Sequence, residues 1–140
     1  MYIVIQLLTA ALGALGYALL FGIQRRYLAA TAIGGLITWG IYLALNSWIG
    51  MSFLACLIAS SFAIVYSEML ARWYKTPAIL FVVPSIVPLV PGGSLYYAMS
   101  EAVQGNLQQA RDYGRDTLIF ALAIACGICL VTAARDLKRQ

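Results

Sequence analysis

Histidine is absent from this 140-residue chain, and charged residues are scarce, with nine Lys or Arg and five Asp or Glu. Charged residues make up 10% of the chain, whereas a soluble domain carries about 25%. Hydrophobic residues make up 63%. So few charges cannot cover a globule of this size in water, and the composition therefore excludes a soluble catalytic domain.

The lack of histidine and the scarcity of cysteine exclude most metal and triad chemistry. The three cysteines are Cys56, Cys126 and Cys129. The last two form a CxxC pattern, but it lies within an apolar segment, where we expect the thiols to pack as small apolar groups. We expect no enzymatic activity, no metal and no cofactor. No basic run exceeds two residues, so nucleic acid is not an expected partner.

Long runs without any charge dominate the chain and cover residues 1–24, 27–67, 76–100 and 117–134. A helix that crosses the hydrocarbon core of a membrane needs about 20 apolar residues. The sequence therefore predicts an all-α, polytopic helical membrane protein in contact with lipid. Residues 1–140 are expected to form a single transmembrane domain in the cell membrane, with about five spans.

The expected spans follow these runs. They are Tyr2–Ile23, Leu28–Leu45, Met51–Ala71, a fourth that begins after Pro77, and Thr117–Ala134. A tight turn is expected at residues 46–50 and a polar connection at residues 104–116. The first span lacks a charged start and a small-residue cleavage site, so we expect it to be retained rather than removed as a signal peptide.

The basic residues predict an orientation, because Lys and Arg accumulate on the cytoplasmic side of membrane proteins. Five spans with the N-terminus outside place seven basic residues in the cytoplasm and two, Arg111 and Arg115, outside. The seven are Arg25, Arg26, Arg72, Lys75, Arg135, Lys138 and Arg139. A re-entrant fourth segment gives six against three. The comparison favours an outside N-terminus and a cytoplasmic C-terminus.

Small residues recur at the spacing that lets membrane helices approach closely. One row is Ala55, Ala59 and Ala63, and a second begins with Ala121 and Ala125. The glycines at positions 13, 16, 34 and 35 are also expected to mark close helix contacts. Five short helices are few to enclose a path for a solute, so we expect oligomerisation or a partner subunit.

The fourth segment cannot form one regular helix. It contains Pro84, Pro88 and Pro91, followed by Gly92, Gly93 and Ser94. An interior proline removes a hydrogen bond and kinks or breaks a helix, and broken backbone is tolerated in a membrane only inside protein or beside water. A new helix beginning here, capped by Ser94, would present free N–H groups to a substrate carboxylate. The alternative is a kinked structural helix or a loop at the membrane face.

Beyond this break, Ser94, Tyr97 and Glu101 share one helical face. Leu95, Met99, Val103 and Leu107 lie at every fourth position on a neighbouring face. Such a pattern fits a helix whose polar stripe faces a cavity, and equally a helix that lies in the membrane interface.

Two carboxylates are candidates for proton coupling, Glu68 and Glu101, because a carboxylate within a bilayer is costly and commonly serves a proton relay. Arg72 lies four residues after Glu68 on the same helical face, so an ion pair at the membrane boundary is the alternative explanation. Glu101 has the same ambiguity.

The run from Ala71 to Met99, ARWYKTPAILFVVPSIVPLVPGGSLYYAM, resembles the hallmark of the threonine/serine exporter family. The shared features are an aromatic and basic end of the third span and a P-x3-P-x2-P-G run with a tyrosine shortly after it. In particular, the chain is similar to the small membrane subunit found where that exporter is split into two chains.

The resemblance implies proton-driven export of threonine, serine or related small carboxylates. It also implies a larger partner with a soluble domain and its own five-helix membrane half. The family motif falls on Pro84, Pro88, Pro91, Gly92 and either Tyr96 or Tyr97. A non-transporting structural or regulatory membrane subunit is the alternative function.

Overall fold

The computed structural model describes residues 2–137, and in that range the chain forms helices and no strand. The helices are α1 (Tyr2–Leu20), α2 (Arg25–Ile49), α3 (Ser52–Tyr74), α4 (Ile79–Ile86), α5 (Gly92–Val103) and α6 (Leu107–Leu137), with a 3₁₀ turn, η1 (Val87–Leu89), after α4. The predicted all-α class is confirmed. Lys138 and Arg139, which entered the charge comparison, lie outside the described residues.

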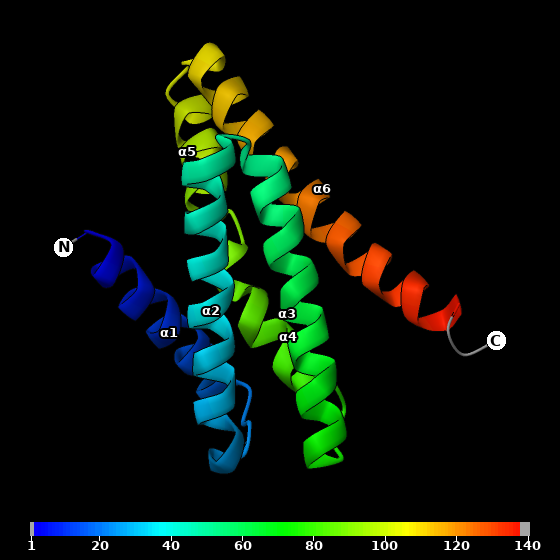
Figure 1. Ribbon diagram of the computed structural model, residues 1–140. Coiled ribbons are helices and arrows are strands. Elements are labelled where there is room, and N and C mark those ends of the chain that lie inside the picture. The colour runs from blue at the N-terminus through cyan, green and yellow to red at the C-terminus, as the bar shows by residue number, and fades with distance from the viewer. Residues whose placement is uncertain (1, 138–140) are drawn as a thin grey trace.

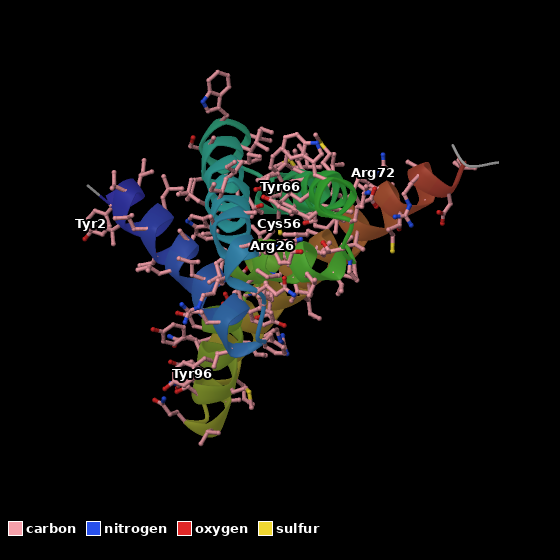
Figure 2. The ribbon with its side chains drawn as sticks, turned by 90° about the horizontal axis from the view of Figure 1, so that it is seen from below. Tyr2, Arg26, Cys56, Tyr66, Arg72 and Tyr96 are labelled. Carbon is pink, nitrogen blue, oxygen red and sulfur yellow. The ribbon has the colours of Figure 1, made fainter. Side chains whose placement is uncertain are left out.

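Helices α2 and α3 form a central antiparallel pair, and α4 packs against both (Figure 1). Helices α1 and α6 lean away from this pair on opposite sides. Figure 2 shows the same divergence from below: α1, which carries Tyr2, and the C-terminal part of α6 extend to opposite sides of Cys56 at the centre. α1 packs on α2, whereas α6 packs on α3 and α5.

Four helices, α1, α2, α3 and α6, are long and apolar enough to span a membrane, and α4–η1 with α5 forms a fifth candidate bent by 51°. In Figure 1 this bent pair starts where α3 ends and finishes beside the turn between α2 and α3. It therefore runs along the whole bundle. The predicted polytopic architecture with a broken fourth segment is confirmed.

Two predicted connections are shorter than expected. The prediction of a turn at residues 46–50 is wrong, because α2 continues to Ile49 and only Gly50 and Met51 link it to α3. Gly50 has a φ of 66° and donates its N–H to the carbonyl of Asn46, which is a helix end that glycine adopts without strain. The predicted extent of the connection at residues 104–116 is also wrong, since α6 begins at Leu107. Gln and Arg are good helix formers, so polarity there marks an exposed helix rather than a loop.

The small-residue row on α3 is confirmed, because Ala55, Ala59 and Ala63 are fully buried. The row proposed on α6 is wrong, since Ala121 and Ala125 are exposed. The face that packs on α3 instead contains Ala123 and Gly127. A Cβ atom at position 127 would overlap the hydroxyl of Ser60. Small residues occupy several faces of α6, so spacing alone could not select the contacting one.

The thiols of α6 also differ from their expected role. Cys126 and Cys129 are exposed, whereas Cys56 is buried in the core. The CxxC pair therefore lies on the outer surface of α6 and does not pack within the bundle.

Two neighbouring glycines let α2 pack closely against three helices, α1, α3 and α4. A Cβ atom at Gly35 would lie 2.7 Å from Cβ of Ala14 on α1. A Cβ atom at Gly34 would overlap the hydroxyl of Ser85 on α4 and lie 2.9 Å from Cε1 of Tyr66. Both contacts confirm the prediction for these glycines. It is wrong for the glycines at 13 and 16, where a Cβ atom would meet nothing within 4 Å.

Replacing Gly34 with alanine should therefore destabilise the bundle by about 1–3 kcal/mol, since overpacking forces neighbouring helices apart. Gly40→Ala on the same helix is the matched control, because its new methyl would meet only the flexible end of Leu7, at 3.5 Å. The control should gain up to about 1 kcal/mol from helix propensity. Denaturant titration in detergent micelles measures both, and equal free energies of unfolding would contradict the packing description.

Candidate functional site

The three prolines of the fourth segment act differently on the backbone. Pro84 lies inside α4, which continues past it to Ile86. Pro88 lies in the first turn of η1, where a missing N–H costs no hydrogen bond. The break comes at Val90, whose ψ of 123° is extended, and at Pro91, which precedes α5 as its N-cap residue.

The start of α5 is open. Gly92 donates its N–H to the carbonyl of Val90 at 2.8 Å, and Leu95 donates to Pro91 at 3.1 Å. Within residues 2–137, the N–H groups of Gly93 and Ser94 have no backbone partner, as expected for a first helical turn. A Cβ atom at Gly92 or Gly93 would meet no atom within 4 Å. This helix start therefore has free N–H donors and open space around its two glycines.

The expected cap at Ser94 is wrong. Helix α5 begins two residues earlier, at Gly92, and has no side-chain hydrogen bond at its cap. Ser94 consequently lies within the first turn, where its hydroxyl is not needed to end the helix.

A pocket of about 230 Å³ lies beside the break, between α1, α2 and η1. Its lining residues are Gln6, Thr9, Ala10, Trp39 and Pro88. The indole N–H of Trp39 is buried and has no hydrogen-bond partner among the described residues. Gln6, Thr9 and Trp39 were not predicted. The signal was present for two of them, because Gln6 and Thr9 are polar, three residues apart and surrounded by apolar residues.

Two hydroxyls in the interior are also unpaired. Ser85, next to Pro84, and Thr38 on α2 are fully buried, and neither hydroxyl has a partner within residues 2–137. Leaving such a group unpaired costs about 1–3 kcal/mol. These two hydroxyls therefore lower the stability of the isolated chain rather than add to it.

The polar stripe of α5 faces α6. The rings of Tyr97 and Tyr113 are 5.5 Å apart, and Glu101 accepts a hydrogen bond of 2.8 Å from the side chain of Asn106 in the α5–α6 connection. The apolar stripe of Leu95, Met99 and Val103 is exposed. Leu107 is not part of it, because α5 ends at Val103. Among the described residues, α5 has no buried side chain.

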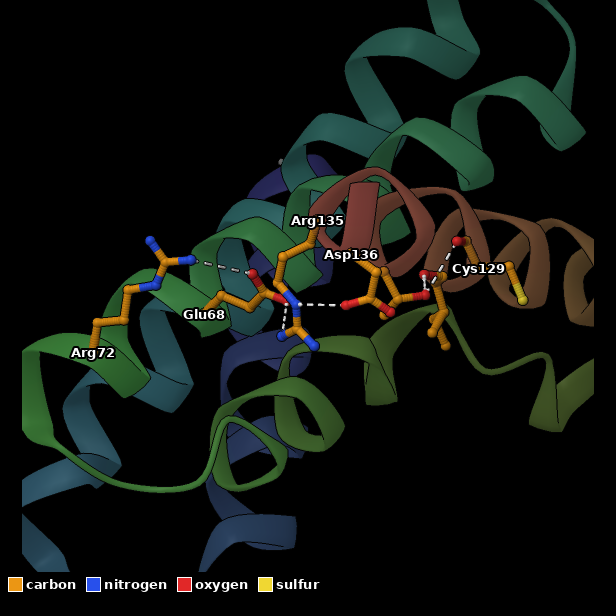
Figure 3. A network of polar contacts seen from close by, with 7 residues as sticks. Glu68, Arg72, Cys129, Arg135 and Asp136 are labelled. Carbon is orange, nitrogen blue, oxygen red and sulfur yellow. Dashed lines mark hydrogen bonds and ion pairs between the residues drawn. The ribbon is translucent and has the colours of Figure 1, made fainter. Parts of the chain in front are cut away.

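Glu68 lies between two guanidinium groups near the end of α3 (Figure 3). Arg135 of α6 donates a hydrogen bond of 2.8 Å to its Oε1. Arg72 approaches Oε2 only to 4.0 Å, which is too long for a hydrogen bond. The predicted partner, Arg72, is thus the weaker one. Sequence spacing could not reveal Arg135, because it is 67 residues away.

The predicted site residues occupy three separate places. Glu68 lies near the end of the bundle where α3 finishes, and Glu101 lies near the opposite end, where α5 finishes (Figure 1). The break at residues 90–94 lies between them. The structure therefore does not bring either carboxylate to the broken helix.

The family model described as the threonine/serine exporter, ThrE, matches residues 6–134. The match includes the broken segment and every described helix in whole or in part. No solved structure matches the chain. Because the family match covers nearly the whole sequence, this multi-pass membrane protein belongs to the threonine/serine exporter (ThrE) family.

Proposed function

We propose that the chain is the small membrane subunit of a two-chain, proton-driven exporter of threonine, serine or related small carboxylates. The observation that carries this proposal is the open start of α5 at Gly92 and Gly93, within a bent span of a chain from an exporter family. Free N–H groups and a partial positive charge at a helix start attract a carboxylate.

The polar groups near the break support the rest of a substrate site. The indole N–H of Trp39, which has no partner among residues 2–137, and the side chains of Gln6 and Thr9 line the pocket beside Pro88. These groups offer donors and acceptors to a hydroxyl or an ammonium group. Alternating access would expose the break to one side of the membrane and then to the other.

A larger partner is supported by the faces that the chain leaves uncovered. Helix α5 has no buried side chain among the described residues, and its exposed side chains include Tyr96, Met99 and Val103. Five short spans that diverge as in Figure 1 do not surround a path by themselves. In the proposed complex, the partner completes that path, the N-terminus lies outside and the C-terminus is cytoplasmic.

Proton coupling is proposed at Glu68, whose carboxylate joins α3 to α6 through Arg135. Protonation would remove the charge that binds Arg135 and would loosen this contact. Glu101 is the weaker candidate, since its carboxylate already accepts a hydrogen bond from Asn106 in the adjacent connection.

A cysteine-accessibility experiment tests the transport function against a purely regulatory one. In a variant whose three native cysteines are replaced, Gly93→Cys should react with a membrane-impermeant thiol reagent, and threonine should slow that reaction. Leu122→Cys is the control, because position 122 is exposed on α6 and lies within the charge-free run 117–134, where lipid excludes the reagent. No reaction at position 93, or reaction unaffected by threonine, would favour a non-transporting subunit.

A further inference from the structure

We infer that the pocket between Glu68, Arg72 and Arg135 is a second binding site for a small amino acid in its zwitterionic form. This inference rests on the proposed function and adds to it a site at the end of the bundle, apart from the broken helix. The pocket has a volume of about 200 Å³ and is lined by Glu68, Ala71, Arg72, Thr76, Ala78 and Arg135.

The charged groups of this pocket keep unused hydrogen-bonding capacity. Glu68 is 15% exposed and uses Oε1 to accept from Arg135 at 2.8 Å. Its Oε2 faces Arg72 across 4.0 Å, which is beyond hydrogen-bond distance. The gap therefore separates a carboxylate oxygen from a guanidinium group that is 77% exposed.

An amino-acid zwitterion lying in the pocket alongside Glu68 and Arg72 would complement both groups in charge. Its ammonium group would donate to Oε2 of Glu68, and its carboxylate would accept from Arg72, which can bind it in a bidentate manner. Both contacts are charge-assisted, the stronger class of hydrogen bond in proteins.

A third group in the pocket is unpaired. The hydroxyl oxygen of Thr76 is buried and has no hydrogen-bond partner within the described part of the chain. The backbone N–H of Thr76 donates to the carbonyl of Ala71 at 3.0 Å and holds the residue at the end of α3, beside the pocket. A hydroxyl group on the ligand, as in threonine and serine, would give this buried oxygen a partner.

The test measures binding of radiolabelled threonine to the purified complex in phosphatidylglycerol nanodiscs. It uses the Gly92→Leu variant, in which the leucine blocks the proposed site at the start of α5. Threonine that still binds to this variant is therefore bound in the pocket of Glu68, Arg72 and Arg135. Arg72→Gln and Thr76→Val should each raise the Kd about tenfold, as the loss of one ligand hydrogen bond predicts. Arg111→Gln is the matched control, because Arg111 is an exposed arginine of α6 that does not line the pocket. It should change the Kd less than about twofold.

Threonine analogues identify the charges that the pocket recognises. Threonine methyl ester lacks the carboxylate charge, and N-acetylthreonine lacks the ammonium group. Both should bind about tenfold more weakly than threonine. Arg72→Gln should remove the preference for threonine over its methyl ester, because the ester already lacks the contact that the variant loses. A structural arginine would not change this preference.

Two results would overturn the inference. One is a Kd in Arg72→Gln and Thr76→Val equal to that of the parent, while the complex with native Gly92 still exports threonine; the proposed function then stands without the second site. The other is loss of threonine binding when phosphatidylethanolamine is added, which would assign the pocket to a lipid headgroup with the same two charges. Absence of export by the native complex would instead count against the proposed function.

Discussion

Replacing Gly92 with leucine should lower threonine export about tenfold or more while the protein still inserts and assembles. The chain itself has room for the new side chain, because a Cβ atom at this position would meet nothing within 4 Å. The leucine would instead fill the space in front of the free N–H groups of α5. Each charge-assisted hydrogen bond lost there is worth about 1.5–3 kcal/mol, so export should fall about tenfold or more.

Gly13→Leu on α1 is the control for this substitution, since a Cβ atom there also meets nothing within 4 Å. Export is measured with labelled threonine, and the amount of assembled protein is measured in the same membranes. If Gly92→Leu prevented insertion or assembly, the broken segment would be a folding element and its role in substrate binding would be refuted.

Replacing Glu68 with glutamine should uncouple export from the proton gradient. Glutamine resembles the protonated carboxyl group, so the charged contact between α3 and Arg135 would be lost at every pH. With one proton exchanged per threonine, a gradient of one pH unit drives about a tenfold concentration ratio. In proteoliposomes, the variant should move threonine only until the two sides are about equal.

Asp136→Asn provides the comparison, because Asp136 is also close to Arg135, at 3.7 Å, but is largely exposed. This control should keep the full gradient-driven accumulation. A Glu68→Gln protein that accumulates threonine as well as the parent would make the Glu68–Arg135 contact purely structural.

The spans and the break were predictable because they depend on local properties of the sequence. Apolar runs set the length of the helices, and the prolines with Gly92 locate the interruption. The limits of the turns were less predictable. A single glycine in a left-handed conformation, Gly50, replaces the five-residue turn that polarity suggested.

Contacts between distant segments were not predictable from one sequence. The partner of Glu68 comes from α6 and not from the arginine one turn away. Likewise, Gly127 and not Ala125 meets α3, because the rotation of a helix depends on every neighbour that it packs against. The pocket beside the break was missed for the same reason, since Trp39 reaches it from another helix.

The most direct test of the exporter assignment is efflux of labelled threonine from cells that lack this chain. Efflux is compared before and after the chain is restored together with a larger membrane protein of the same family. Rapid efflux should require both chains and should stop when an uncoupler collapses the proton gradient. Efflux that is equally fast without this chain would contradict the exporter assignment.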